Sequence, residues 1–230
     1  MPSVVRLTTA GLAAAAVIAG AAGCTDIDEA SAASITRGGL ASAMAGQFAA
    51  GSGITYTATY QVGGDGSATI TRAQSPTRTA YIYPGGRLVT GLHGTIRCTG
   101  DTAPTCTESD PDPAAAAALA DTRLVTPEAA QTMLNAAALD PDAIATPHDT
   151  TVAGRHANCL ELSKVDGTLA SAFTVCVTNE GALASFSATI KGEHADMALT
   201  AYSDKVTDPD VFITPRDAKV TSKRAKFPGA

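Results

Sequence analysis

The sequence predicts an α+β domain in which an antiparallel sheet, built from two meanders of short strands, is covered by three helices. Two blocks of period-two alternation, each divided by turn-forming glycines, predict the meanders. Two proline-marked helix starts lie between the blocks, and a further helical segment precedes the first block. Because amphipathic helices need an apolar surface to cover, we expect them to lie on one face of the sheet.

The first helix is expected over residues 37–50. Its apolar residues recur at every fourth position, which places them on one face: Leu40, Met44 and Phe48. Gly51 follows directly and is expected to end the helix.

The first meander begins with a strand over residues 54–62, where apolar and polar residues alternate and Tyr56 and Tyr60 share the apolar face. A glycine-rich turn at 63–66 leads to a return strand that starts at Ser67. The same pattern predicts further short strands over residues 79–83, 87–92 and 94–99.

The middle of the chain changes from strand to helix signals. Asp112-Pro113 resembles an N-cap followed by proline at the first helical position, and a helix is expected over 114–119. Thr126-Pro127 repeats the signature and begins a helix with Met133 on its apolar face, which Asp140-Pro141 ends.

Strand patterns return in the second half and predict a second antiparallel meander. The strands are expected over residues 151–152, 157–165, 172–178, 183–190 and 197–206.

The cysteines provide a test of strand register. In an antiparallel hairpin, opposed residues have a constant index sum, so pairing Cys159 with Cys176 centres the turn between Gly167 and Thr168, where Asp166-Gly167 already predicts one. Side-chain alternation then places both cysteines on the outer face. The opposite, apolar face carries Leu160, Leu162, Phe173 and Val175.

Cys98 and Cys106 flank a run of turn-forming residues, which predicts a second, local disulfide. Four cysteines allow three pairings, so the connectivity stays open at this point. The competing interpretation is a zinc or redox site, but the C-x-x-C spacing typical of both is missing. We therefore expect two disulfides and no metal site.

Residues 1–23 are typical of a lipoprotein signal peptide, with Arg6 followed by an uninterrupted stretch of apolar and small residues. The stretch ends in Ala-Ala-Gly before Cys24, which resembles a lipobox and predicts a lipid on Cys24. The protein would then sit on the outer, extracytoplasmic face of the cell membrane. Ordinary secretion with cleavage near Cys24 is the alternative.

The predicted organisation is a tether over residues 24–34, a single domain over 35–215 and a basic flexible tail over 216–230. A solvated tail is preferred to one that contacts anionic lipid or cell-wall polymer. The chain has 16 Lys and Arg against 22 Asp and Glu, which argues against a nucleic-acid partner.

The sequence contains little that indicates catalysis. Neither G-x-S-x-G nor S-x-x-K is present, no glycine loop lies at a strand-to-helix junction, and the aspartates beside prolines lack the EF-hand pattern. The four histidines, His93, His148, His156 and His194, are scattered. We expect a protein that is not an enzyme and has no cofactor, with an envelope enzyme as the least favoured alternative.

The order of elements around Cys24, the Tyr56–Ile70 hairpin, the two cysteine pairs and Phe212-Ile213-Thr214-Pro215 resembles actinobacterial lipoproteins of the LppX/LprG type. More distantly it is similar to the LolA/LolB lipoprotein carriers. The resemblance implies a half-open barrel whose concave face is covered by helices, with an apolar ligand between them. Two disulfides and few aromatic residues depart from that group.

A lipid or other hydrophobic ligand is therefore the expected partner, held by residues of the apolar faces. The expected ligand-binding residues are Tyr56, Tyr60, Met133, Leu160, Leu162, Phe173, Val175 and Phe186. These side chains could equally pack against the helices with no cavity. The alternative function is a non-catalytic accessory or sensor domain that docks onto another envelope protein.

Overall fold

The computed structural model describes the backbone of residues 29–122 and 124–225, and the side chains from residue 38 onward except at positions 121 and 123. The predicted signal peptide, Cys24 and the last five residues of the predicted tail lie outside the described residues. Among the described helices, none is long and apolar enough to cross a membrane.

The described residues form an α+β fold with two α-helices, two short 3-10 helices and twelve strands. The helical elements are α1 (Glu29–Gly51), η1 (Ala117–Thr122), α2 (Pro127–Leu139) and η2 (Pro209–Phe212). The strands of the first half are β1 (Tyr56–Val62), β2 (Gly66–Gln74), β3 (Thr77–Tyr83), β4 (Gly86–Gly91), β5 (Gly94–Thr99) and β6 (Thr105–Ser109). The strands of the second half are β7 (Ile144–Val152), β8 (Arg155–Ser163), β9 (Phe173–Thr178), β10 (Leu183–Ile190), β11 (Glu193–Ser203) and β12 (Lys219–Ser222).

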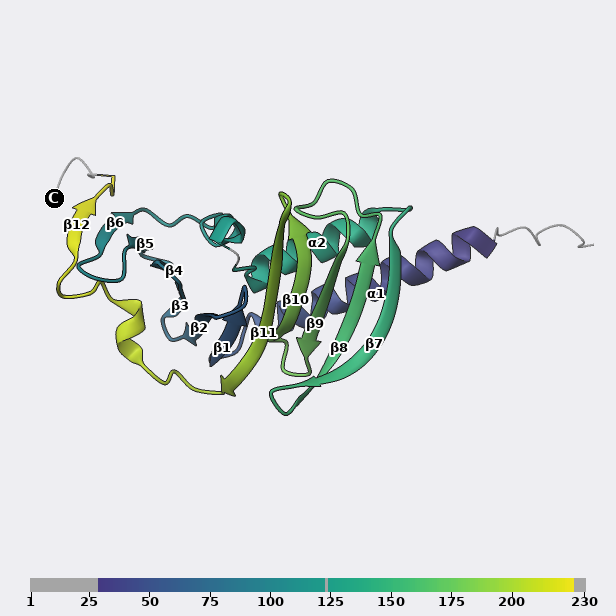
Figure 1. Cartoon of the computed structure of the whole chain (residues 1–230), viewed down its shortest axis with the longest axis horizontal. Coiled ribbons are helices and arrows are strands. Elements are labelled where there is room, and N and C mark those ends of the chain that lie inside the picture. Colours follow the sequence, from purple (N-terminus) through teal and green to yellow (C-terminus); the bar gives the residue numbers. More distant parts are fainter. Residues whose placement is uncertain (1–28, 123, 226–230) are drawn as a thin grey trace, which may run out of the picture.

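All twelve strands belong to one open sheet in the order β12-β6-β5-β4-β3-β2-β1-β11-β10-β9-β8-β7. The two predicted meanders are joined where β1 pairs with β11, and every pairing is antiparallel except β12 with β6. Figure 1 shows β7 to β11 broadside and β1 to β5 nearly end-on, so the sheet bends strongly between its two halves. The helices α1 and α2 lie beside the β7 to β11 half.

The predicted register of the second hairpin is confirmed. Cys159 lies opposite Cys176, Leu160 opposite Val175, and Leu162 opposite Phe173. Both predicted disulfides are present, Cys159–Cys176 and Cys98–Cys106, and each joins residues that face each other across neighbouring strands. Two disulfides are typical of proteins outside the cytoplasm.

Helix α1 begins at Glu29, within the segment expected to be a tether over residues 24–34. The helix expected to start at residue 37 therefore starts eight residues earlier, because the alanine-rich sequence before residue 37 also favours a helix. Met44 and Phe48 are buried as predicted. α1 packs closely on α2 at Gly38, where an added Cβ would lie 2.8 Å from the carbonyl oxygen of Ala138.

The α-helix expected over residues 114–119 is wrong, because this segment forms a 3-10 helix that begins at Ala117. The described residues therefore contain two α-helices rather than the three expected. Asp112 instead stabilises the turn that precedes this 3-10 helix, since its carboxylate accepts a hydrogen bond from the backbone N–H of Ala114 at 2.9 Å. The prediction for α2 is confirmed in detail. Thr126 is its N-cap and accepts from the N–H of Ala129, and Pro127 stands at the start.

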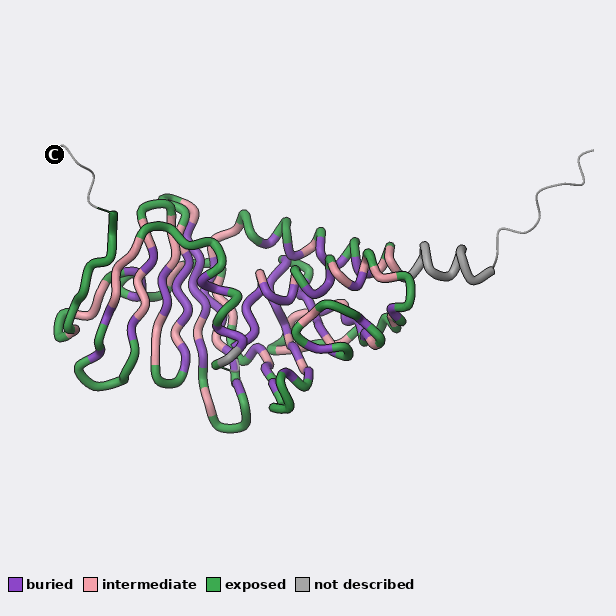
Figure 2. The backbone as a smooth tube through the Cα atoms, turned by 90° about the horizontal axis from the view of Figure 1, so that it is seen from above, coloured by how far each residue is buried: buried purple, intermediate pink, exposed green. Residues whose placement is uncertain are grey.

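The sheet is covered on both faces. The main core lies between its inner face and the helices, and the central strands are buried over much of their length (Figure 2). A smaller core on the opposite face contains Val89 and Phe212, the latter from residues 204–215, which we call the C-terminal strap. The strap leaves β11, crosses the sheet through η2 and ends beside β6 (Figure 1).

The tail predicted over residues 216–230 is not wholly flexible. Lys219–Ser222 form β12, which pairs in parallel with β6. The backbone N–H of Lys219 donates to the carbonyl of Pro104 at 2.9 Å, and that of Lys223 donates to the carbonyl of Glu108 at 2.7 Å. An exposed sheet edge carries unpaired backbone groups, and this pairing satisfies those of β6.

At the opposite edge, β7 has no outer neighbour among the described strands. The Cα atoms of Cys159 and Cys176 are 4.0 Å apart, which marks a non-hydrogen-bonded pair, so Cys159 directs its backbone groups toward β7 and His148. Backbone N–H and C=O groups alternate in direction along a strand, so the backbone groups of the neighbouring residue, Pro147, point away from β8 toward the open edge of the sheet. A proline there costs no ladder hydrogen bond and removes a donor from the exposed edge.

Candidate functional site

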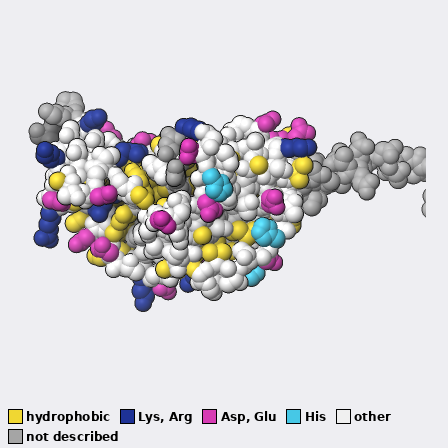
Figure 3. Space-filling view, in the orientation of Figure 1, with side chains coloured by type: hydrophobic (Ala, Val, Ile, Leu, Met, Phe, Trp, Pro, Cys, Tyr) yellow, Lys and Arg dark blue, Asp and Glu magenta, His cyan; other side chains and the backbone are white. Residues whose placement is uncertain are grey.

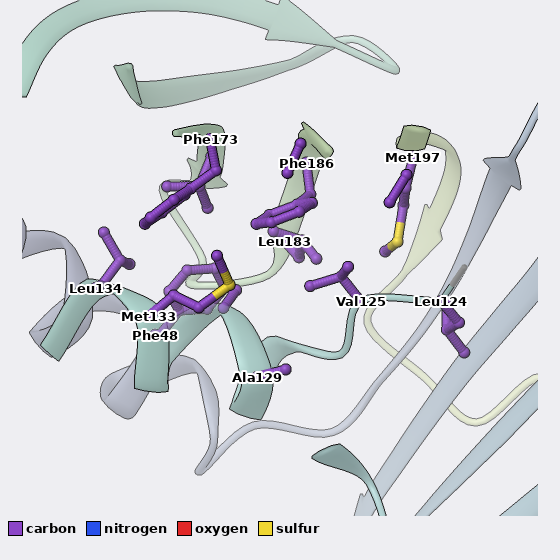
Figure 4. Packing of buried hydrophobic residues seen from close by; sticks show 14 of the residues in the cluster. Phe48, Leu124, Val125, Ala129, Met133, Leu134, Phe173, Leu183, Phe186 and Met197 are labelled. Atoms are coloured by element: carbon purple, nitrogen blue, oxygen red, sulfur yellow. The ribbon is translucent and has the colours of Figure 1, made fainter. Parts of the chain in front are cut away.

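The eight predicted ligand-binding residues come together in the structure. Tyr56 and Tyr60 lie on β1, Met133 on α2, and the others on β8, β9 and β10, and all eight are buried in the main core. The rings of Phe173 and Phe186 stack with centroids 5.9 Å apart. One end of this cluster is shown in Figure 4, where Phe173 and Phe186 point from the sheet toward Met133 and Phe48.

These side chains pack against the helices, which is the alternative that the sequence left open. Phe48 from α1 and Leu134 from α2 project into the space beneath the strands (Figure 4). Tyr60 is fixed further by its hydroxyl, which donates to the carbonyl oxygen of Leu183 at 2.9 Å. The interior is therefore occupied by the protein's own side chains over most of this cluster.

An apolar hollow opens beside the cluster, and we call it the α2 hollow. It has a volume of about 380 Å³ and is bounded by η1, α2 and the loop between β8 and β9. Met133 is the member of the predicted ligand set that lines it. The lining residues are Ala117, Ala129, Thr132, Met133, Ala136, Gly167, Thr168 and Leu169.

The loop that forms one wall of the α2 hollow is tied to the end of α2. The carboxylate of Asp140 accepts hydrogen bonds from the backbone N–H of Asp166 at 2.8 Å and of Asp142 at 2.9 Å. These bonds favour the ionised carboxylate and lower the pKa of Asp140. Within the loop, the hydroxyl of Thr168 donates to the carbonyl of Ala170 at 2.7 Å.

The other end of α2 is tied to the sheet by a polar cluster that the sequence did not predict. Arg72 of β2 pairs with Glu128, and the hydroxyl of Tyr81 on β3 donates to the second carboxylate oxygen of Glu128 at 2.9 Å. Arg72 is 7% exposed and its guanidinium lies 5.9 Å from the ring centre of Tyr56. Glu128 stands in the first turn of α2, where a negative charge suits the helix dipole.

The sequence did not predict this polar cluster, because Arg72 occupies an inward position on the otherwise apolar face of β2. The signal that could have found it is Arg72 itself, which continues the inward positions of Ala68 and Ile70, because a buried charge needs a partner. Arg72 Nε is buried and has no hydrogen-bond partner within the part of the chain that the structure describes.

The four histidines come from separate places, as the sequence suggested. His93 lies in the β4–β5 turn, His156 on β8, His194 on β11, and His148 on β7 opposite Cys159. Lys and Arg side chains gather at the end of the molecule that carries β12, on the face drawn in Figure 3, while acidic groups are spread over that face.

The architecture defines a class of protein with one open, mostly antiparallel sheet that is covered by two α-helices. No protein-family profile and no curated protein matches the chain. Among solved structures, it is similar to an uncharacterized conserved protein from Thermus thermophilus, with a TM-score of 0.51 and 12% identity, covering 80% of this chain and 99% of that one. This likeness shows the fold alone.

MucB, in a crystal structure of its complex with MucA(peri), matches more weakly. The TM-score is 0.43 at 14% identity, and the match covers 79% of this chain and 61% of that chain. A similarity of this size supports no inference about ligand or partner.

Proposed function

We propose that this protein is a lipoprotein held on the outer face of a cell membrane by a lipid on Cys24, and that its domain binds an acyl chain or a similar apolar molecule. The α2 hollow is the observation that supports this proposal most directly. It opens beside the side chains that the resemblance to LppX/LprG-type and LolA-like proteins implies as ligand contacts.

The lining of the α2 hollow suits an apolar ligand. Alanines, Met133 and Leu169 form most of its walls, and the polar groups near it are the hydroxyls of Thr132 and Thr168. Ligand pockets occupy roughly 300–1,000 Å³, so a hollow of about 380 Å³ is at the small end. We therefore propose that it takes one acyl chain rather than a whole diacyl lipid.

The ties at both ends of α2 give the wall of the hollow a defined position. Glu128 fixes the start of the helix to β2 and β3, and Asp140 fixes its end to the β8–β9 loop. A chain that enters between Met133 and Leu169 would lie on preformed apolar surface, so little ordering would be needed on binding.

Mild extraction followed by native mass spectrometry should show an acyl species bound to the wild-type protein. A fluorescent fatty acid should bind the protein after its non-covalently bound acyl species has been removed, and that acyl species should displace it. Ala136→Trp fills the hollow and should weaken binding at least about tenfold, because the added ring occupies the ligand's space. Asn135→Trp, on the exposed side of α2, is the matched control and should bind as wild type.

Equal binding by wild type and Ala136→Trp would contradict the proposed site. If the protein purifies without a bound acyl species and does not bind the fatty acid, the proposed function in binding apolar ligands would be contradicted.

A second candidate, a domain that docks onto another envelope protein, is favoured by the filled interior and by exposed apolar residues around the same hollow. Leu139 at the end of α2 is 86% exposed and Leu169 is 40% exposed. Leu139→Asp should then abolish co-purification of a partner, while native mass spectra of wild type and variant show no acyl species beyond the covalent lipid on Cys24. Retention of the partner by the variant would count against docking at this surface.

A further inference from the structure

We propose that Cys159, Cys176 and His148 form a redox-gated metal site, in which the reduced cysteines and the imidazole bind a thiophilic cation such as Zn²⁺. The three residues lie side by side on β7, β8 and β9, because His148 is opposite Cys159 and Cys159 is opposite Cys176. Their ligand atoms all lie within 4.8 Å of one another.

The geometry is close to what a tetrahedral ion requires. Bonds of about 2.3 Å to sulfur and about 2.1 Å to nitrogen place neighbouring ligand atoms roughly 3.5 to 3.8 Å apart. In the disulfide state the two sulfurs are bonded to each other, so metal binding needs them to separate by rotation of the cysteine side chains. The backbone pairing of three adjacent strands can stay in place throughout.

Exposure and ligand type also fit a metal ion. Cys159 and Cys176 are buried, at 1% and 3% exposed, whereas His148 is exposed on the edge strand, so the ion can arrive from the histidine side. Two thiolates and one imidazole are ligands that Zn²⁺ and Cu⁺ prefer. Three protein ligands leave a fourth position for water or for a group from a partner.

The chemistry balances with a dithiol as reductant. The dithiol transfers two electrons and two protons to the Cys159–Cys176 bond, which opens to two thiols while the reductant closes to its own disulfide. Binding of Zn²⁺ then releases the two thiol protons and leaves a neutral dithiolate complex with neutral His148. The disulfide and the bound metal exclude each other, which makes occupancy depend on redox state.

The second disulfide is a matched internal control. Cys98 and Cys106 face each other across β5 and β6 in the same way, but their outer neighbours are Arg87 on β4 and Val220 on β12. Neither neighbour offers a metal ligand. Within the described residues, His148, Cys159 and Cys176 are the one group of three His, Cys, Asp or Glu side chains whose ligand atoms lie close enough together to hold a metal ion. The spacing of the cysteines in the sequence did not predict this site, because its ligands come from three neighbouring strands rather than from a C-x-x-C motif.

The test uses the full chain with Cys24→Ser, so that a fifth thiol cannot bind metal. The protein is reduced, freed of reductant under anaerobic conditions and titrated with Co²⁺ as a spectroscopic substitute for Zn²⁺. One Co²⁺ per chain is expected, with thiolate charge-transfer absorption and the intense visible bands of tetrahedral cobalt, and Zn²⁺ should displace it. The oxidised protein should show neither the charge-transfer absorption nor the visible cobalt bands.

Four variants in the same background locate the site. Cys159→Ser with Cys176→Ser should abolish the cobalt bands, and Cys98→Ser with Cys106→Ser should leave them unchanged. His148→Ala should weaken binding by at least about tenfold, since loss of even an outer-shell partner costs about 10–100-fold. His156→Ala, on the same hairpin but outside the cluster, should bind as wild type.

Alkylation mapped by mass spectrometry gives a readout that does not depend on absorbance. Zn²⁺ should lower the alkylation of Cys159 and Cys176 by iodoacetamide in the reduced protein and leave the alkylation of Cys98 and Cys106 unchanged. If reduction loosens the fold, Zn²⁺ should restore the circular dichroism spectrum of wild type but not of His148→Ala. No cobalt bands in the reduced protein, or equal binding by wild type and His148→Ala, would overturn the proposal.

Discussion

Three tyrosines show how single buried residues make the fold sensitive to alkaline pH. Burial raises the pKa of Tyr56 to about 12, against the lowering effect of Arg72, and burial also raises the pKa values of Tyr60 and Tyr81 well above the ordinary value of 10.0. A buried phenolate is costly because it loses its hydration. The folded protein therefore holds these three phenols in the neutral form.

We expect the protein to lose stability between about pH 10 and pH 12. Below pH 10 the phenols are neutral in both the folded and the unfolded chain, so their contribution to stability is fully present. Above pH 10 the unfolded chain releases its protons first, and stability falls until the folded pKa is reached. A shift of about two pKa units makes this roughly 3 kcal/mol for Tyr56 alone.

Urea unfolding across this pH range would measure the loss, and tyrosinate absorbance would report the ionisation. The chain has five tyrosines and no tryptophan, so the absorbance is simple to interpret. Tyr56→Phe should reduce the slope of stability against pH. A stability that stays constant up to pH 12 would show that these phenols ionise without unfolding the protein.

At the scale of elements, the sequence predicted strands well where one face is apolar and poorly where both faces are polar. β10 has its predicted bounds, and the β8–β9 register follows from the cysteines. β7 was missed over residues 144–150 because its residues are mostly exposed and Pro147 interrupts the pattern. β6 and β12 were missed for a similar reason, since both are short and mostly polar.

The candidate site shows the same division. Period-two patterns placed Tyr60, Leu160 and Phe173 in one buried cluster, because alternation determines the face of each residue. The cluster of Arg72, Tyr81 and Glu128 depends on how α2 meets the sheet, which is a tertiary contact that local patterns do not encode. The α2 hollow is invisible in sequence for the same reason.

The contact between α1 and the β9–β10 turn depends on two glycines. A Cβ on Gly51 would lie 2.2 Å from the carbonyl oxygen of Gly181, and Gly181 has a φ of +84° that favours glycine. Gly51→Ala should therefore destabilise the protein by about 2 to 4 kcal/mol, because the helix end must move away from the turn. A fall in the urea midpoint at unchanged m-value would measure it.

Gly46→Ala is the matched control, because Gly46 lies in the same helix and an added Cβ would meet nothing within 4 Å. It should stabilise the protein by about 0.5 to 1 kcal/mol through helix propensity. Equal effects of the two substitutions would mean that the α1 end does not rest on the turn as described.

At the scale of the whole molecule, one sheet serves two cores. Its inner face packs on α1 and α2, while the outer face of β2 to β5 packs on the C-terminal strap. The strap is held by side chains of the sheet as well as by apolar contact. The hydroxyl of Thr57 donates to the carbonyl of Lys205 at 2.8 Å, Arg87 donates to the carbonyl of Ile213 at 3.1 Å, and the guanidinium of Arg78 lies 4.2 Å from the ring centre of Phe212.

Two truncations should separate the contributions of the strap and of β12. A chain that ends at residue 215 loses β12 and keeps Val211 and Phe212, so we expect a cooperative fold with a small loss of stability. A chain that ends at residue 203 also exposes the apolar outer face of β2 to β5, where Ala80 and Val89 are otherwise buried. Burial of a large apolar side chain contributes about 1.5 to 3 kcal/mol, so the loss of Val211 and Phe212 should cost at least about 3 kcal/mol.

The urea midpoints of the two truncated chains and their binding of a hydrophobic dye would check this expectation. The shorter chain should bind dye strongly, because the outer face of the sheet becomes an exposed apolar patch. Phe212→Ala in the full chain should show part of the same loss without removing any backbone. Similar midpoints for both truncations would place the contribution of the C-terminus in β12 rather than in the strap, and the sheet would then depend on its inner core alone.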